Sequence, residues 1–565
     1  MENLISMIKS ISLDRMLFFV GSGISLESPS CLPTGNQLAQ FILDISTNCG
    51  GTFKNIWNEV TAKIDESSVC TNYPRLESIA ACVMNTEIYV NIHEKLNFID
   101  GFSSFQDAPF NHNHALLAIF MHHGATIITT NFDLCIQNAY IKIFGERLQR
   151  HVDNGDGGVF YYSTYSNVGK IIHIHGTSDS REHIGVTLDN LMSGVVPSLN
   201  KHIEYGVNSS IHCVYMGYSF SDAFDISPFI KRLASKALDD TKHCIILNSH
   251  NDHTITRMSK IFAQRQIAVG SATNFLMRLA KEFGISRSYE LHQEVYNWKS
   301  EFIKKLNINT DFKQIVALNI AGQFRLDIDC ILGNRNKTLD ELIAKYNVDK
   351  RAGIAYGLYV TSKSLDCQAL DKYFGDYHKR ALISRKATDY NSVMENYAKK
   401  KLDYDVLEQR MIHMDKISWD TILSLSAWNH AILYKYLSVR DQSEVAKFFA
   451  LLDKAIALPF ARFPGMLAYA TCLRYRHIME AIAYKTIGMY GKDALEIYYD
   501  FGNFEGIISS FMYMALGDHI VLDQSINTNK YILKAIDIAK VVRSYRYIEK
   551  IDNLMQFLSH HVASH

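Results

Sequence analysis

The feature that most constrains the fold is a set of five short apolar runs, each ending in glycine or in a polar turn. These runs are MLFFVGSG from Met16, ATIITTNFD from Ala125, KIIHIHG from Lys170, HCVYMGYS from His212 and KHCIILNS from Lys242. Continuous apolar runs rich in Ile and Val are typical of strands buried on both faces of a parallel sheet. Segments with helical periodicity lie between the runs. The alternation predicts an α/β domain with a doubly wound, mostly parallel, Rossmann-like sheet.

The segment after the first run predicts the first of these helices. Four apolar residues repeat at the helical spacing i, i+3, i+4 and i+7: Leu38, Phe41, Ile42 and Ile45. Thr34 and Gln37 have the spacing of a capping box, which begins a helix. The stretch FFVGSGISLESPSCLPTG, residues 18 to 35, therefore predicts a strand, a glycine turn and a short loop before this helix.

The second half of the chain has a different organisation. Six of the eight prolines lie at or before Pro228, and the next is Pro459, so long helices can form in between. Apolar stripes with helical spacing occur at residues 445–456 and 425–436. We predict an α/β catalytic domain over residues 1–290 and an all-helical regulatory or partner-binding domain over residues 291–565. Both an irregular bundle and an array of helix-pair repeats fit the second domain.

Polar residues gather where the carboxyl edge of the predicted sheet should lie. They follow the five runs in order: Gly21, Ser22, Gly23; Thr129, Thr130, Asn131, Asp133; His175, Gly176; Gly217, Ser219; and Asn248, Ser249. Taken singly, each has a structural explanation, because glycines make turns and Thr, Asn and Asp cap helices. The functional alternative is a ligand site, with the backbone N–H groups of the glycine loop directed at a pyrophosphate.

The order and spacing of these motifs resemble the sirtuin family of NAD-consuming enzymes over about residues 10 to 290. GSGIS, residues 21 to 25, is similar to the Gly-Ala-Gly-Ile-Ser loop that wraps the NAD pyrophosphate. TTNFD resembles Thr-Gln-Asn-x-Asp, with Thr130 in place of the glutamine. The His-Gly pair at 175 and 176 matches the catalytic histidine motif.

The resemblance implies that NAD⁺ is the substrate and assigns roles to the residues of the site. His175 would be the general base on the nicotinamide ribose, and Asn131 and Asp133 would hold the ribose and the attacking group. The remaining contacts with NAD⁺ would come from Gly21, Ser22, Gly23, Ser25, Thr129, Gly217, Ser219 and Asn248. These residue types suit the chemistry, because cleavage of the nicotinamide C–N bond needs a positioned ribose and a base that titrates near neutrality.

Two departures from the sirtuin pattern point to one branch of the family. Sirtuin deacetylases carry a zinc module with two Cys-x-x-Cys pairs, whereas only Cys213 and Cys244 lie between His175 and residue 290. The family's Pro-Asp-Phe-Arg is PTGN at residues 33 to 36. With these departures and its helical extension, the chain resembles the sirtuin-like NADases of bacterial antiphage defence. The sequence GYSFSD at residues 217 to 222 also resembles that branch. That resemblance implies a hydrolase that depletes cellular NAD⁺ in abortive infection.

Such an enzyme has to be silent until it is triggered. We expect the helical half to inhibit the catalytic half until a phage product or a partner subunit binds, within a homo-oligomer or a hetero-complex. Two alternatives stay open: a sensor of NAD⁺ or ADP-ribose without catalysis, and a zinc-free protein deacylase or ADP-ribosyltransferase. A cyclising reaction also passes through the same C–N cleavage.

Composition argues against several other function classes. The 58 basic and 58 acidic residues balance, so we expect no direct nucleic-acid partner and no membrane association. No apolar run reaches the roughly 18 residues of a membrane span, and no signal peptide is evident, so we expect a cytoplasmic protein. We also expect no metal at the histidines of residues 112–123, because no Cys or carboxylate has a matching spacing.

Overall fold

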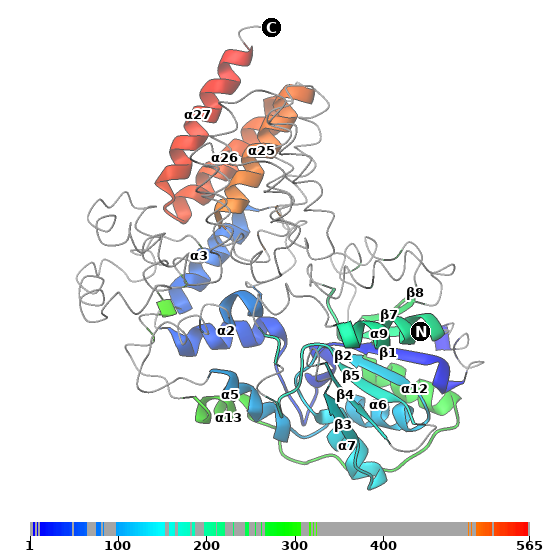
Figure 1. Ribbon diagram of the computed structural model, residues 1–565. Helices are drawn as coiled ribbons and strands as arrows, with labels where there is room; N and C mark the ends of the chain where they lie inside the picture. Colours follow the sequence, from blue (N-terminus) through cyan, green and yellow to red (C-terminus); the bar gives the residue numbers. More distant parts are fainter. Residues whose placement is uncertain are drawn as a thin grey trace, which may run out of the picture. The chain divides into compact units, whose positions relative to one another are not determined.

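The structure is a computed structural model (Figure 1). It describes residues 12–47, 50–64, 75–80, 98–152, 158–163, 168–180, 184–186, 197–210, 212–220, 243–247, 266–306, 504–522 and 525–562, with a few further residues outside these ranges. The chain forms two compact units. The first contains residues 1–38, 96–186 and 194–307, and the second contains residues 39–95, 187–193 and 308–565. Residues 39–95 thus group with the C-terminal part, and the domain boundary at residue 290 stays a prediction.

One eight-stranded sheet organises the first unit, in the order β3-β4-β5-β2-β1-β6-β7-β8. All five predicted strands are confirmed: β1 (Met16–Val20), β2 (Thr126–Thr129), β5 (Lys170–His173), β6 (His212–Met216) and β7 (His243–Leu247). With β8 (Gln266–Val269) they form a parallel sheet. β3 (Gln149–Val152) and β4 (Val159–Tyr162) add an antiparallel hairpin beside β5. The prediction of a mostly parallel α/β sheet is confirmed.

The order of the parallel strands locates the place where a ligand would bind. Taken along the chain, β5-β2-β1-β6-β7-β8 is the Rossmann order 3-2-1-4-5-6. The order reverses between β1 and β6, and ligands of such sheets bind at this switch point, beyond the carboxyl ends of the strands. Val20 lies opposite both Thr129 of β2 and Met216 of β6, so these three strands end at the same level.

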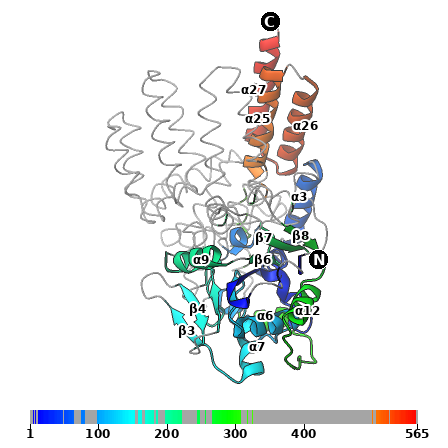
Figure 2. The same cartoon turned by 90° about the vertical axis from the view of Figure 1, so that its right-hand side faces the viewer.

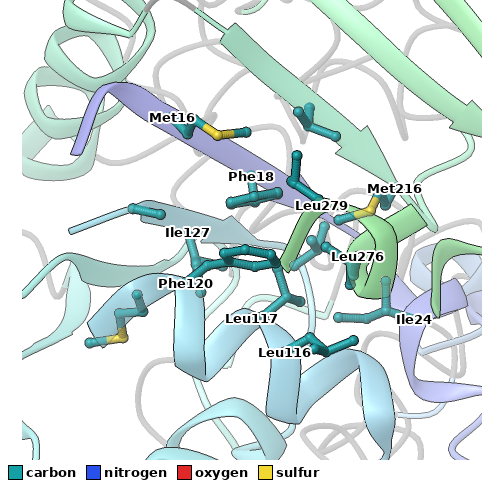
Figure 3. Close-up of a cluster of buried hydrophobic side chains, with 14 of the residues drawn as sticks. Met16, Phe18, Ile24, Leu116, Leu117, Phe120, Ile127, Met216, Leu276 and Leu279 are labelled. Carbon is teal, nitrogen blue, oxygen red and sulfur yellow. The ribbon is translucent and has the colours of Figure 1, made fainter. Parts of the chain in front are cut away.

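Helices cover both faces of the sheet (Figures 1 and 2). α6 (His112–His122), α7 (Cys135–Phe144) and α12 (Ala272–Glu282) pack against one face, and α9 (Pro197–Ser209) packs against the other. Successive residues of β1 point to opposite faces, so Phe18 joins the core beneath α6 while Leu17 joins the core beneath α9. Phe18 stacks on Phe120 of α6 with ring centroids 5.4 Å apart (Figure 3). This double burial explains why the strands are continuously apolar.

The predicted capping box is present at the start of α2 (Gly35–Ser46). The Thr34 N–H donates to Gln37 Oε1 over 2.9 Å, and the Gln37 N–H donates to Thr34 Oγ1 over 3.3 Å. Leu38 and Ile42 of the predicted apolar face are buried. The short helices that the structure describes in the first unit are η1 (Leu13–Arg15), η2 (Ser22–Ser25), α5 (Phe98–Phe102), η4 (Ser103–Asp107) and α13 (Trp298–Lys304).

The main helices described in the second unit are α3 (Gly50–Lys63), α25 (Phe504–Leu522), α26 (Ser525–Val541) and α27 (Tyr545–Val562). Trp57 of α3 packs on Tyr499 with ring centroids 4.5 Å apart and on Phe504 at 5.8 Å. Lys63 Nζ lies 3.6 Å from Asp537 Oδ2 of α26. The stripes at 425–436 and 445–456 lie outside the described residues. Within the described part of the chain, every helix is too short or too polar to cross a bilayer.

Candidate functional site

The turns after β1 and β6 pack against each other at the switch point through three glycines. The Gly21 N–H donates to Met216 O over 3.0 Å, and the Gly23 N–H donates to Gly217 O over 2.9 Å. A Cβ on Gly21 would lie 2.6 Å from Gly217 O, and one on Gly23 would lie 2.7 Å from Gly217 Cα. Gly217 also has a φ of +61°, which favours glycine. These glycines therefore allow the turn after β1 and the turn after β6 to approach each other closely.

This packing bears on the expected pyrophosphate loop. Because the N–H groups of Gly21 and Gly23 already donate to carbonyls of the protein, a phosphate would have to be held by other donors. Ser22 lies half-buried on the same loop, whereas Ser25 is fully buried below it. Ser219 is exposed after β6, and Asn248 lies outside the described residues.

The loop after β2 is held to the turn after β5 by backbone hydrogen bonds. The Ile174 N–H donates to Thr129 O over 3.0 Å, and the Ser178 N–H donates to Phe132 O over 2.8 Å. The Asn131 N–H donates to Thr129 Oγ1 over 3.0 Å. Buried Thr129 thus fixes the backbone from which Asn131 and Asp133 project.

Ser25 is the centre of a buried hydrogen-bond network that joins the loop after β1 to the loop after β2. Its Oγ lies 3.1 Å from Asp133 Oδ2, 3.1 Å from Asn131 Nδ2 and 3.0 Å from His114 Nε2. A hydroxyl has one donor and two acceptor positions. Because a carboxylate only accepts, Ser25 donates to Asp133, and both acceptor positions then take hydrogens from Asn131 and His114.

The tautomer of His114 follows from the N-terminus of α6. The Asn111 N–H donates to His114 Nδ1 over 3.1 Å, and the His114 N–H donates back to Asn111 Oδ1 over 3.2 Å. Nδ1 therefore accepts, and Nε2 carries the hydrogen that goes to Ser25. Burial lowers the pKa of His114 to about 4, against a smaller opposing effect of Asp133, so the imidazole is neutral at neutral pH.

The direction of this network excludes a serine-hydrolase triad. In a triad the histidine accepts the serine proton and the carboxylate orients the histidine. Here His114 donates to Ser25, and Ser25 donates to Asp133. Ser25 is also only 1% exposed, so it is a structural hydroxyl rather than a nucleophile.

The side-chain amide oxygen of Asn131 is a buried acceptor on the loop after β2. Asn131 is only 7% exposed, and its buried Oδ1 has no hydrogen-bond partner among the residues that the structure describes. A buried acceptor without a partner costs about 1–3 kcal/mol, so such atoms call for an explanation. A ligand that donates a hydroxyl or N–H hydrogen would remove this cost.

His175 lies beside this loop, in the turn that follows β5. Its ring centroid is 6.4 Å from that of Phe132, the residue between Asn131 and Asp133. Phe132 in turn meets Phe102 of α5 edge-on at 5.2 Å. His175 is half-buried, whereas His173 on β5 is only 1% exposed. The structure therefore places the half-buried His175 beside the loop that carries Asn131 and Asp133, and the catalytic roles of these three residues stay a prediction.

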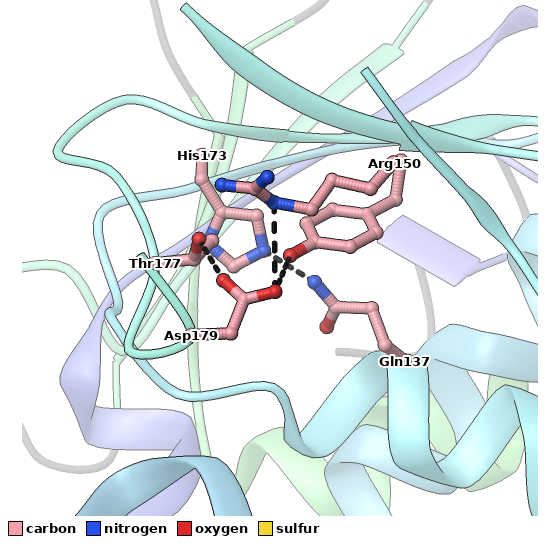
Figure 4. A network of polar contacts seen from close by, with 6 residues as sticks. Gln137, Arg150, His173, Thr177 and Asp179 are labelled. Carbon is pink, nitrogen blue, oxygen red and sulfur yellow. Dashed lines mark hydrogen bonds and ion pairs between the residues drawn. The ribbon is translucent and has the colours of Figure 1, made fainter. Parts of the chain in front are cut away.

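A second polar network includes His173 of β5 and Gln137 of α7 (Figure 4). His173 Nδ1 donates to the Asn131 carbonyl over 2.9 Å, and Gln137 Nε2 donates to His173 Nε2 over 2.6 Å. Burial lowers the pKa of His173, mainly through desolvation, so this ring is also neutral at neutral pH. His173 and Gln137 thus fix the backbone of Asn131, while Ser25 fixes its side chain.

The same view shows how the turn that carries His175 is tied to the antiparallel hairpin. Asp179 accepts hydrogen bonds from Tyr161 Oη over 2.9 Å and from Thr177 Oγ1 over 2.5 Å, and Arg150 Nε lies 3.5 Å away (Figure 4). Burial and the Asp179 charge raise the pKa of Tyr161, so its phenol stays protonated and donates.

One group of side chains has the composition of a metal site. Ligand atoms of His114, Asp133 and Cys135 lie within 4.8 Å of one another, although His114 comes from a different helix than the other two residues' segment. The donor set does not fit a metal, because both His114 nitrogens are already hydrogen-bonded. Burial also raises the pKa of Cys135, and its thiol lies 3.6 Å from Ala108 O, whereas a metal requires the thiolate. The absence of a metal from the site stays a prediction.

Sequence reasoning missed His114, His173 and Gln137 as parts of the site. His114 falls among the histidines at which the sequence predicts no metal, and its hydrogen bond to Ser25 joins residues that are far apart in the chain. The available signal was local: Asn111 stands three residues before His114, at the start of an apolar helical segment, which is typical of a helix cap.

Comparison with known protein families identifies part of this region. Residues 125–269 match the model of the SIR2-like domain family. The match runs from the start of β2 to the end of β8, and includes Asn131, Asp133 and His175. SIR2-like domains bind NAD⁺, so this region supports a sirtuin-like, NAD-related activity. No curated protein matches the chain.

Proposed function

We propose that this protein is an NAD⁺ hydrolase that releases nicotinamide and leaves ADP-ribose. The observation that carries the proposal is the buried Asn131 Oδ1, which has no hydrogen-bond partner among the described residues and lies on the loop that also contacts His175. This loop follows β2 at the carboxyl edge of a Rossmann-ordered sheet, within the region that matches a SIR2-like domain. A ribose hydroxyl is a donor that such an atom can bind.

The proposed reaction uses each group according to its position. Asn131 accepts a hydrogen bond from a ribose hydroxyl, and the Asp133 carboxylate stabilises the positive charge that develops on the sugar. The bond between C1′ and the nicotinamide nitrogen breaks, and its electron pair leaves with the now neutral nicotinamide. Water forms the new C1′–O bond and gives its proton to His175, the half-buried imidazole of the site.

Hydrolysis is favoured over protein deacylation because the cysteines that follow His175 are not placed to form a zinc module. The two cysteines after His175 that precede residue 290 are Cys213 on β6 and Cys244 on β7, and both are buried in the sheet. Burial raises the pKa of Cys244 to about 12, so it is a thiol rather than a metal-binding thiolate. These cysteines therefore serve as core residues, and no peptide-binding module is built from them.

We further propose that the NADase acts in antiphage defence and that the helical second unit controls it, through a phage product or a partner subunit. Support comes from the resemblance of the sequence to defence NADases. Control by the second unit has to be tested on the full chain. Truncation after residue 290 would remove Tyr499 and Phe504 from Trp57, which is buried against them, and would damage the unit that contains α3.

The test measures nicotinamide released from NAD⁺ by the purified full chain, with and without lysate from phage-infected cells. We expect release by the native protein, increased by the infected lysate, and its loss in His175→Ala. His123→Ala is the matched control, because His123 is exposed in the turn before β2, at the opposite edge of the sheet. Equal release by the native protein and His175→Ala would refute the role of His175. Binding of NAD⁺ without release would show a sensor.

A further inference from the structure

We infer that His114 is a positioning residue that acts through Ser25 to turn the Asn131 amide oxygen toward a ligand donor. The inference rests on the proposed function, in which that donor is a hydroxyl of NAD⁺. His114 is 0% exposed, so it does not reach the substrate itself. What it controls is the direction of the hydrogen bonds between three other residues.

The first step is that the N-terminal cap of α6 determines the tautomer of His114. The Asn111 N–H is fixed by the start of α6 and is directed at His114 Nδ1, 3.1 Å away. A hydrogen on Nδ1 would face this N–H, so the hydrogen lies on Nε2. The side of His114 that faces Ser25 is therefore always a donor.

The second step is the saturation of Ser25. Its hydroxyl hydrogen goes to Asp133, and His114 occupies one of its two acceptor positions. The remaining position accepts a hydrogen and cannot supply one. Asn131 can meet it only with its amide NH₂, at the observed distance of 3.1 Å.

The third step is the consequence for Asn131. If the amide were turned over, Oδ1 would face the oxygen of Ser25 with no hydrogen between them, which is repulsive. The NH₂ group is thus held at Ser25, and Oδ1 is left as the buried atom without a partner in the described part of the protein. Without the hydrogen from His114, Ser25 could rotate and donate to Asn131, and the amide would then turn its NH₂ group toward the ligand.

Two substitutions separate this role from that of a packed core histidine. His114→Gln places an amide NH₂ near the position of Nε2 and keeps a donor toward Ser25. His114→Asn keeps an acceptor for the Asn111 N–H but is too short to donate to Ser25. His112→Asn, at an exposed position of the same helix, is the matched control.

The assay is the affinity for NAD⁺ of the full chain carrying His175→Ala, which prevents turnover, measured by calorimetry. We expect His114→Asn to weaken binding about tenfold, the effect of one hydrogen bond, and His114→Gln to weaken it less. In a Ser25→Ala background, His114→Asn should have no further effect, because the link through Ser25 is already broken. Equal weakening by His114→Asn in both backgrounds, or none at all, would overturn the inference.

A second measurement does not depend on the ligand. Imidazole ¹⁵N shifts of the full chain should show His114 as the neutral Nε2–H tautomer at neutral pH, and the Asn131 side-chain amide should be protected from exchange. That protection should be lost in His114→Asn and kept in His112→Asn. An Nδ1–H tautomer, or unchanged protection in His114→Asn, would overturn the inference. Failure of the native chain to bind NAD⁺ would count against the proposed function, and this measurement would still decide the role of His114.

Discussion

Gly217→Ala tests whether the glycines of the switch point are required by the packing of two turns. An added Cβ would lie 2.6 Å from Ile24 N and 2.9 Å from Gly23 C, so the backbone of the neighbouring turn would have to move. Such overpacking costs about 1–3 kcal/mol. The φ of +61° adds about 1–2 kcal/mol for a residue with a side chain. We expect a loss of about 2–5 kcal/mol in the free energy of unfolding of the first unit.

Two further alanine substitutions separate these contributions. Gly284 has a φ of +65° with nothing within 4 Å of an added Cβ, so Gly284→Ala should cost only the conformational part, about 1–2 kcal/mol. An added Cβ on Gly23 would lie 2.7 Å from Gly217 Cα, so Gly23→Ala should cost about 1–3 kcal/mol through overpacking.

Hydrogen exchange of the β1 and β6 amides, followed by mass spectrometry, measures these losses separately from the second unit. Each tenfold acceleration of exchange corresponds to about 1.4 kcal/mol. The reasoning predicts that Gly217→Ala accelerates exchange more than Gly284→Ala does. If Gly23→Ala and Gly217→Ala exchanged like the native protein but lost affinity for NAD⁺, the glycines would serve the ligand instead, and the packing account would be refuted.

Three other predictions concern the cap, the second unit and pH. Thr34→Ala should destabilise α2 by about 0.5–2 kcal/mol, seen as faster exchange of its amides, while Asn36→Ala, at an exposed position of the same turn, should have little effect. Trp57→Ala should lower the stability of the second unit by about 3–5 kcal/mol in thermal unfolding, and Trp57→Phe should cost less. Because the folded-state pKa of His114 is about 4 and the unfolded value is 6.5, the unfolded chain binds a proton first as the pH falls. The first unit should therefore lose roughly 3 kcal/mol of stability between pH 6.5 and 4, and exchange in His114→Asn should not show this part of the loss.

The central strands were predictable because burial on both faces leaves a continuous apolar run. Every residue of β1, β6 and β7 is buried, and each strand was visible as such a run. The strands that sequence reasoning missed lie at or near the edges of the sheet. β3, with the sequence QRHV, is largely exposed, and β8 buries only Ala268. An edge strand needs no apolar run, so periodicity gives no signal for it.

The site was predictable where it depends on strand order and not where it depends on tertiary contacts. Parallel strands bring the residues that follow them to one edge, which is why the sequence predicts that Asn131, Asp133 and His175 lie near one another. The glycines at 21, 23 and 217 were also found, but the sequence cannot show that they face each other. His114 reaches Ser25 only through the packing of α6, and no spacing rule connects two residues so far apart.

The most direct test of the account is a calorimetric titration of NAD⁺ into the full chain carrying His175→Ala, compared with the same chain carrying Asn131→Ala as well. The account predicts one NAD⁺ bound per chain in the first case and a large loss of affinity in the second, since Asn131 Oδ1 is the buried acceptor that the ligand satisfies. Equal affinity in the two proteins, or no binding by the first, would contradict the assignment of this site to NAD⁺.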